Sequence, residues 1–111
     1  MKNFASLARK VAKKSSNSHF QHAALIIKSG RVLAWATNDG TKHAEEIAMN
    51  QRKWRGDLAG ATLISIRLKK SGGFGLARPC IWCSERAKTE GISDIYYSDK
   101  LGGMVLCPIK G

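Results

Sequence analysis

The chain has 111 residues, enough for one domain but too few for two domains with separate cores, so we expect a single domain over residues 1–111. Apolar residues make up 43% of the chain, which excludes a mainly disordered protein. The 19 Lys and Arg against 8 Asp and Glu give a formal net charge of +11. This charge favours a polyanionic partner or a phosphorylated substrate, the alternative being a basic surface without a specific partner.

The sequence shows no apolar run near the roughly 20 residues that a membrane-spanning helix needs. Its first residues, Met1-Lys2-Asn3-Phe4, lack the apolar stretch of a secretory signal, although the basic, amphipathic first 14 residues leave a transit peptide as an alternative. Of three cysteines, Cys80 and Cys83 lie close together at an expected helix start, where a disulfide fits badly, and Cys107 stands alone. Reduced thiols and a cytoplasmic location are therefore expected.

Apolar periodicity predicts the first elements in chain order. Residues 3–14 have the spacing of an amphipathic helix. Two apolar strands, 23–28 and 31–37, flank Ser29-Gly30 and form a hairpin. A turn at 38–41 then leads into a helix that Thr41 can cap and that runs to about Trp54.

The second half continues the alternation of strands and helices. Residues 61–68 predict a third strand, and a glycine-rich loop follows over 69–77. A helix begins near Pro79 and ends at Gly91, followed by a strand over 92–97 and a short fifth strand over 103–107. This order predicts an α/β fold, a three-layer α/β/α sandwich around a mixed sheet of four to five strands.

Three side chains are candidate ligands of one metal ion. Catalytic zinc takes three protein ligands and leaves a fourth place for water, and His43, Cys80 and Cys83 are of the right kinds. Cys80 and Cys83 are three apart on one helix face, where the unpaired N–H groups and the helix dipole favour thiolates. Since His43 begins another helix, one ion can join the two helix ends.

Glu45 lies two residues beyond His43. Helical residues two apart do not share a face, so Glu45 is poorly placed to bind the same ion but well placed to reach a water beside it. A carboxylate there can take a proton from this water and deliver it to a leaving amine. Hydrolytic deamination needs this proton transfer.

These residues resemble the cytidine deaminase-like superfamily, whose signature is His-x-Glu followed by Pro-Cys-x-x-Cys. The resemblance covers roughly residues 20–98, with the signature present as His43-Ala44-Glu45 and Pro79-Cys80-Ile81-Trp82-Cys83. It implies that zinc binds His43, Cys80 and Cys83, that Glu45 shuttles the proton, and that Asn38 contacts the base. We also expect Ala44 and Tyr97 to contact the substrate. A homo-oligomer is a further implication.

Other interpretations of single residues remain. A structural zinc site would need a fourth ligand, for which His19, His22 and Cys107 are the spare candidates, and a redox pair would need no histidine. His22 either faces the site or is a hydrogen-bonded core residue. Trp82 either walls the pocket or belongs to the core, whereas Trp35 and Trp54 are expected in the core or in helix packing.

The substrate is less sharply defined. The superfamily acts on cytidine, deoxycytidylate, guanine, adenosine in transfer RNA, and cytosine in nucleic acid. Only about five residues, 99–103, separate the last two strands, so these strands must pair antiparallel. This is similar to the free-cytidine branch and to some small polynucleotide-targeting bacterial deaminases. It is unlike the transfer-RNA, deoxycytidylate and polynucleotide-editing branches, in which a helix joins these strands.

We therefore expect a zinc-dependent deaminase that converts cytosine to uracil on a free (deoxy)cytidine nucleoside or nucleotide. The alternative is cytosine in single-stranded nucleic acid, and a third possibility is a non-catalytic, zinc-stabilised nucleic-acid-binding domain. The basic residues near the metal motifs favour single-stranded nucleic acid as the substrate. They are Arg52, Lys53 and Arg55; Arg67, Lys69 and Lys70; and Arg78.

Overall fold

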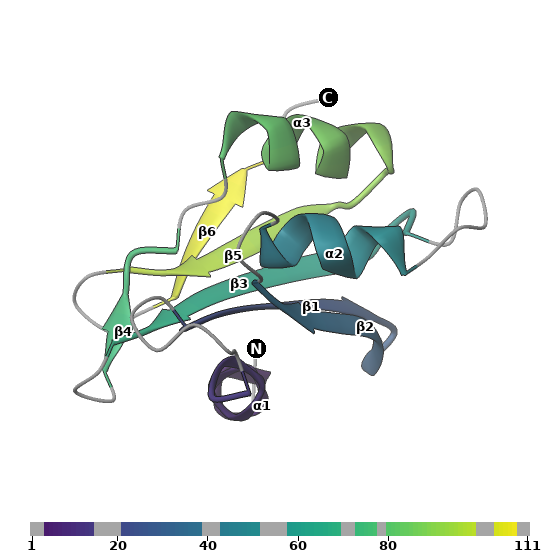
Figure 1. Ribbon diagram of the computed structural model, residues 1–111. Helices are drawn as coiled ribbons and strands as arrows, with labels where there is room; N and C mark the ends of the chain where they lie inside the picture. Colours follow the sequence, from purple (N-terminus) through teal and green to yellow (C-terminus); the bar gives the residue numbers. More distant parts are fainter. Residues whose placement is uncertain are drawn as a thin grey trace.

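A single sheet with helices on both faces makes up the computed structural model, which describes residues 4–14, 21–38, 43–51, 58–69, 73–77, 80–99 and 104–108 (Figure 1). Helix α1 covers one face, and helices α2 and α3 cover the other. In chain order the elements are α1 (Phe4–Ala12), β1 (Gln21–Lys28), β2 (Arg31–Thr37), α2 (Ala44–Asn50), β3 (Thr62–Leu68), β4 (Phe74–Gly75), α3 (Ile81–Thr89), β5 (Asp94–Ser98) and β6 (Met104–Pro108). The predicted three-layer α/β/α sandwich is confirmed.

The sheet has the strand order β2-β1-β3-β5-β6, and the short strand β4 pairs with β3. Strands β3 and β5 are parallel, whereas the other described pairs are antiparallel, so the sheet is mixed. The antiparallel pairing of β5 with β6 confirms the expectation drawn from their short connection. Strand β4 was not predicted, because two residues inside a glycine-rich loop show no recognisable periodicity.

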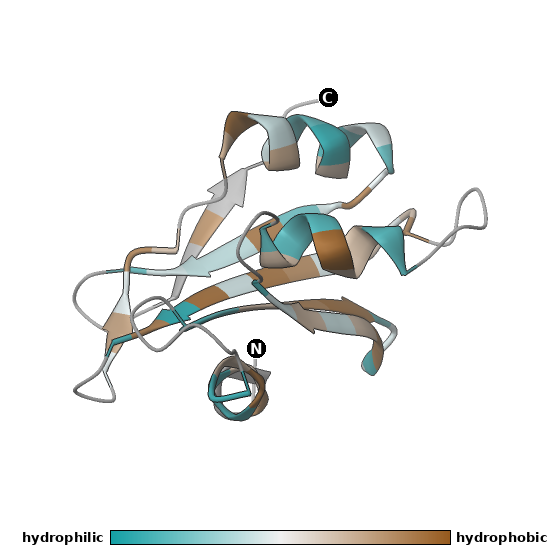
Figure 2. Ribbon diagram, viewed as in Figure 1, coloured by the Kyte–Doolittle hydropathy of each residue, from teal (hydrophilic) through white to brown (hydrophobic). Residues whose placement is uncertain are grey.

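Strand β1 is apolar on both faces because it lies between two helical layers. Ala24 and Ile26 belong to the core beneath α2 and α3, and Ala23, Leu25 and Ile27 to the core beneath α1. Figure 2 shows apolar residues along the inner strands β1 and β3. A strand buried on both faces is expected to be continuously apolar rather than alternating.

Two local predictions need correction. Trp35 is not a core residue, because its side chain is 44% exposed on the edge strand β2, where the Lys14 ammonium lies 5.0 Å from the ring centroid. Helix α2 begins at Ala44 with His43 as its N-cap. Thr41, the predicted cap, and Trp54 both lie outside the described residues.

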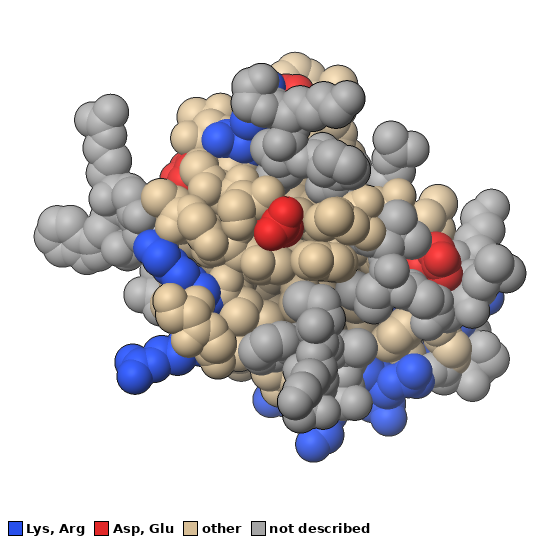
Figure 3. Space-filling model, turned by 180° about the vertical axis from the view of Figure 1, so that it is seen from behind, with Lys and Arg blue, Asp and Glu red and all other residues tan. Residues whose placement is uncertain are grey.

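Positive charge gathers on the α1 side of the sheet. Residues 4–14 contain four basic and no acidic side chains. Seen from behind, the blue side chains lie mostly along the lower edge of the molecule, where α1 lies (Figure 3). Among the described helices, none combines the length and apolarity that crossing a bilayer requires.

Ser98 fixes the segment that leads toward α3. Its buried hydroxyl donates to the Gly75 carbonyl oxygen at 2.6 Å and accepts from the Arg67 N–H at 3.1 Å. The Ser98 carbonyl accepts from the Ala77 N–H at 2.9 Å. The end of β5 therefore holds both β4 and Ala77, two residues beyond β4, in place.

Changing Ser98→Ala is expected to lower the free energy of unfolding by about 1–3 kcal/mol, because two buried backbone groups lose their partner. Chemical denaturation of the metal-loaded protein measures this change. Ser93→Ala is the matched control, since that hydroxyl also bonds to backbone oxygens but belongs to an exposed residue. An equal effect of the two substitutions would contradict the anchoring role of Ser98.

Candidate metal centre

The starts of two helices meet at one point. His43 is the N-cap of α2 and Cys80 is the N-cap of α3, each with extended backbone dihedrals. Cys83 lies in the first turn of α3, and its N–H donates to the Cys80 sulfur at 3.4 Å. The sulfur of Cys80 thus caps α3 by accepting a hydrogen bond from the Cys83 N–H in the first turn of the helix.

The spacing of the three side chains fits a zinc ion. The His43 Nδ1 atom lies 3.4 Å from Cys80 Sγ and 3.6 Å from Cys83 Sγ. Zinc–nitrogen and zinc–sulfur bonds meeting at a tetrahedral angle place the two ligand atoms about 3.5 Å apart. All three ligand atoms lie within 4.8 Å of one another. One zinc ion can therefore bind all three.

Without a cation, the surroundings of Cys83 favour the neutral thiol over the thiolate. Burial and the neighbouring Cys80 raise the pKa of the Cys83 thiol well above its usual range, and the negative charge of Glu45 adds to this effect. A thiolate there would be poorly solvated and close to other negative charge. A divalent cation reverses this balance, because it stabilises the deprotonated sulfur directly.

The ligand set has three members in the part of the chain that the structure describes. His22, one candidate for a fourth ligand, is turned toward Glu45 instead. His19 and the side chain of Cys107 lie outside the described residues. Three protein ligands are typical of catalytic zinc, whereas structural zinc takes four.

Glu45 is a buried carboxylate, 1% exposed. Its Oε1 atom accepts from the Ser65 hydroxyl at 2.7 Å and lies 2.8 Å from His22 Nε2. Burial alone would raise the pKa of this carboxyl, but the hydrogen bond and charge of His22 and the Ser65 hydroxyl outweigh it and hold the pKa below its usual range. The carboxylate is thus ionised near neutral pH and able to accept a proton.

Sequence reasoning missed Ser65 and left the role of His22 open. Ser65 is fully buried in β3. The signal was its hydroxyl between two isoleucines of a mainly apolar strand, since a buried hydroxyl needs a partner. The His22 side chain, 22% exposed, faces Glu45 rather than a closed apolar core.

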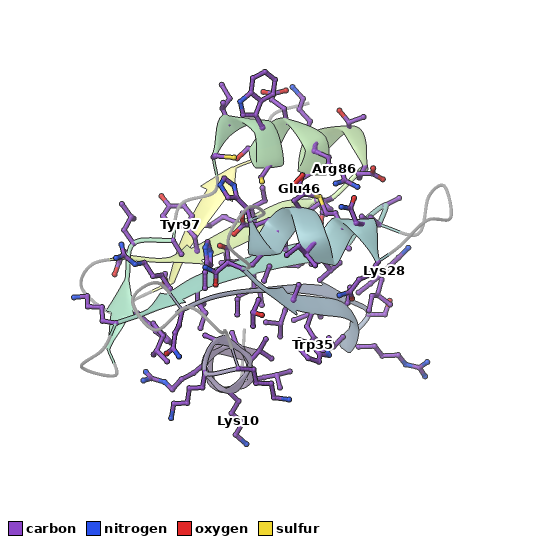
Figure 4. All side chains as sticks on the ribbon, in the orientation of Figure 1. Lys10, Lys28, Trp35, Glu46, Arg86 and Tyr97 are labelled. Carbon is purple, nitrogen blue, oxygen red and sulfur yellow. The ribbon has the colours of Figure 1, made fainter. Side chains whose placement is uncertain are left out.

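The predicted substrate-contact residues lie near this carboxylate. Asn38 Oδ1 accepts from the His22 N–H at 3.0 Å, so its side chain holds the end of β1. Tyr97 is the partner of Ser65 in the β3–β5 pair and shares its side of the sheet (Figure 4). Ala44 is fully buried at the start of α2. Contact of Asn38, Ala44 and Tyr97 with a substrate stays a prediction.

A cavity of about 320 Å³ opens beside the candidate metal ligands. Glu46 and Arg86 approach it from α2 and α3 (Figure 4). Trp82 also lines it and is 81% exposed, so the core placement considered for this residue is wrong. The full lining is His43, Glu46, Cys80, Trp82, Cys83 and Arg86.

Metal affinity is expected to rise with pH, by about tenfold per pH unit for each proton that zinc displaces from the thiols. The raised pKa of Cys83 means that the metal-free protein holds this proton, which binding must release. Competition titrations with a chelator at several pH values measure this dependence. Cys83→Ser should lose the tight site and Cys107→Ser should keep it; pH-independent affinity would contradict the assignment.

Comparison with known proteins places this geometry in a family. Residues 1–99 match the family described as the cytidine and deoxycytidylate deaminase zinc-binding region. None of the curated proteins compared with the chain by sequence is significantly similar to it.

Three solved structures illustrate the shared fold. A cytidine deaminase from Burkholderia pseudomallei superposes with a TM-score of 0.71 at 17% identity, over 98% of this chain and 94% of that one. A tRNA:A34 deaminase that performs A-to-I editing of transfer RNA gives 0.63 at 24% identity, over 90% and 78%. RibD from Acinetobacter baumannii gives 0.63 at 17% identity over 86% of this chain, which spans only 27% of RibD.

The match covers most of the chain and includes His43, Glu45, Cys80 and Cys83, and the fold agrees with that of these enzymes. The chain therefore belongs to the zinc-binding cytidine and deoxycytidylate deaminase family.

Proposed function

We propose that this chain is a hydrolytic deaminase that converts cytosine to uracil, with release of ammonia, on a free (deoxy)cytidine nucleoside or nucleotide. The observation that carries the proposal is the buried, ionised Glu45 carboxylate two residues from His43 in a three-ligand zinc site. A buried charge is costly, and its retention next to a metal site is typical of a catalytic group.

The reaction assigns a proton transfer to Glu45. Water adds its oxygen to the ring carbon that bears the amine, the carbon–nitrogen bond then breaks, and ammonia leaves. Glu45 accepts one proton from the attacking water and passes it to the ring nitrogen. It then takes the second proton from the hydroxyl now bonded to the ring carbon and passes it to the departing amine, which leaves as ammonia. A bound zinc ion would lower the pKa of water, so that a nucleophile is available near neutral pH. His43, Cys80 and Cys83 would hold this ion.

Two features support a small, free substrate. The chain and the cytidine deaminase from Burkholderia pseudomallei cover each other almost completely, so both have the size of one catalytic domain. The last two strands, β5 and β6, pair antiparallel, as the resemblance implies for the free-cytidine branch, although also for some small polynucleotide-targeting bacterial deaminases.

A second candidate is cytosine within single-stranded nucleic acid. The Trp82 ring lies exposed at the cavity beside the cysteines, where a neighbouring base could stack on it, and Arg86 lines the same cavity. The net charge of +11 also favours a polyanion. A non-catalytic zinc-stabilised domain remains the third candidate, but it gives no reason for a buried Glu45.

Changing Glu45→Gln is expected to lower kcat by at least about 10³-fold, because the amide cannot carry the proton. Zinc content and the unfolding midpoint should remain close to those of the unchanged protein. Ammonia release and metal analysis on the same samples measure both. Glu46→Gln, on the next residue of α2, serves as the carboxylate control. Normal turnover by Glu45→Gln would exclude the assigned proton transfer.

A substrate panel separates the two catalytic candidates. We expect ammonia release from cytidine, deoxycytidine or their monophosphates to exceed release from a cytosine-bearing single strand by about tenfold or more in kcat/KM. Activity on the strand alone would favour the second candidate. Activity only on adenosine or guanine would overturn the cytosine assignment.

A further inference from the structure

A closed triangle of polar atoms surrounds one oxygen of Glu45. Ser65 Oγ lies 2.7 Å from Glu45 Oε1, His22 Nε2 lies 2.8 Å from the same oxygen, and His22 Nε2 lies 2.6 Å from Ser65 Oγ. The three side chains come from α2, β3 and β1. Three separate elements therefore converge on one carboxylate oxygen.

The chemistry of these groups fixes where the hydrogens lie. An ionised carboxylate only accepts hydrogen bonds, so both neighbours must direct a hydrogen at Oε1. His22 therefore carries its hydrogen on Nε2, the ring nitrogen that faces Glu45. The single Ser65 hydrogen has two acceptors within reach, Glu45 Oε1 at 2.7 Å and the Ala77 carbonyl oxygen at 3.0 Å, and the shorter distance favours Glu45.

The backbone of His22 is held by contacts that do not involve its imidazole. Its backbone N–H and carbonyl bond to Asn38, and the residue pairs with Arg67 across β1 and β3. These contacts are independent of the side chain. Because these bonds hold both the N–H and the carbonyl of His22, its side chain projects from β1 in a defined direction, toward Glu45. What the ring adds is a contact with this carboxylate.

We propose that His22 is a positioning residue that, with Ser65, locks the Glu45 carboxylate for proton transfer. Both side-chain contacts are made to Oε1, so they fix the plane of the carboxyl group and assign proton transfer to Oε2. Displacement of a catalytic group by about 1 Å can cost about 10²-fold in rate, which makes such locking important. The proposal rests on the proposed function, in which Glu45 carries the proton.

A spectroscopic test addresses the network without using activity. In the zinc-loaded protein, nitrogen NMR should show a hydrogen on His22 Nε2. Glu45→Gln should shift the His22 Nε2 signal, because a charged acceptor becomes neutral, and Glu46→Gln should leave it unchanged. A hydrogen on Nδ1 instead, or a His22 signal indifferent to Glu45→Gln, would overturn the proposal.

Kinetics test what the lock does. His22→Leu is expected to lower kcat by about 30- to 100-fold with KM changed less than about threefold, since the group that moves acts in the chemical step. His22→Gln should recover activity to within about tenfold of the unchanged protein, because its amide nitrogen can donate toward Oε1. Ser65→Ala should lower kcat in the same direction, and Lys28→Leu, at the other end of β1, should not.

The outcomes separate this proposal from the proposed function. Equal losses in His22→Leu and His22→Gln, or a change confined to KM, would show that His22 has a merely structural or binding role. Full activity of His22→Leu would also refute the positioning role of His22. If the unchanged protein releases no ammonia from any substrate, the proposed function fails, and the NMR result still decides whether Glu45 and His22 are coupled.

Discussion

The meeting of two helix starts is the constraint on which the rest of the structure depends. Cys80 and Cys83 lie within 3.6 Å of one nitrogen of His43, although burial raises the pKa of Cys83 and its neighbours disfavour a thiolate. A zinc ion bound to these three side chains would stabilise both sulfurs as thiolates. Zinc therefore belongs to the folded structure as well as to the chemistry, because it joins α2 to α3.

The central strand β3 ties the carboxylate to the metal ligands. The buried hydroxyl of Ser65 contacts Glu45 on α2 and the carbonyl of Ala77, a few residues before Cys80. Ser98 holds Ala77 from the other side. Glu45 and the segment that leads to the two cysteines are thus positioned from neighbouring points of the sheet.

The sequence predicted the layers of the fold and the composition of the metal group, because both follow from short-range spacing. A spacing of three positions places Cys80 beside Cys83 on one face of a helix. Continuous apolar strands predict a sheet that is covered on both faces. The contact of His22 with Ser65 spans 43 positions, and no spacing rule connects them. The exposure of Trp35 was mispredicted and that of Trp82 was left open, because it depends on where an edge strand and a helix start lie in the assembled fold.

The central claim is that zinc binds here with an open coordination place. X-ray absorption on the zinc-loaded protein, without substrate, measures this directly. The account predicts two sulfur ligands at about 2.3 Å, one imidazole nitrogen at about 2.0–2.1 Å, and one solvent-derived light atom. A shell closed by a third sulfur or a second imidazole would identify the ion as structural and contradict the assignment of this site to deamination.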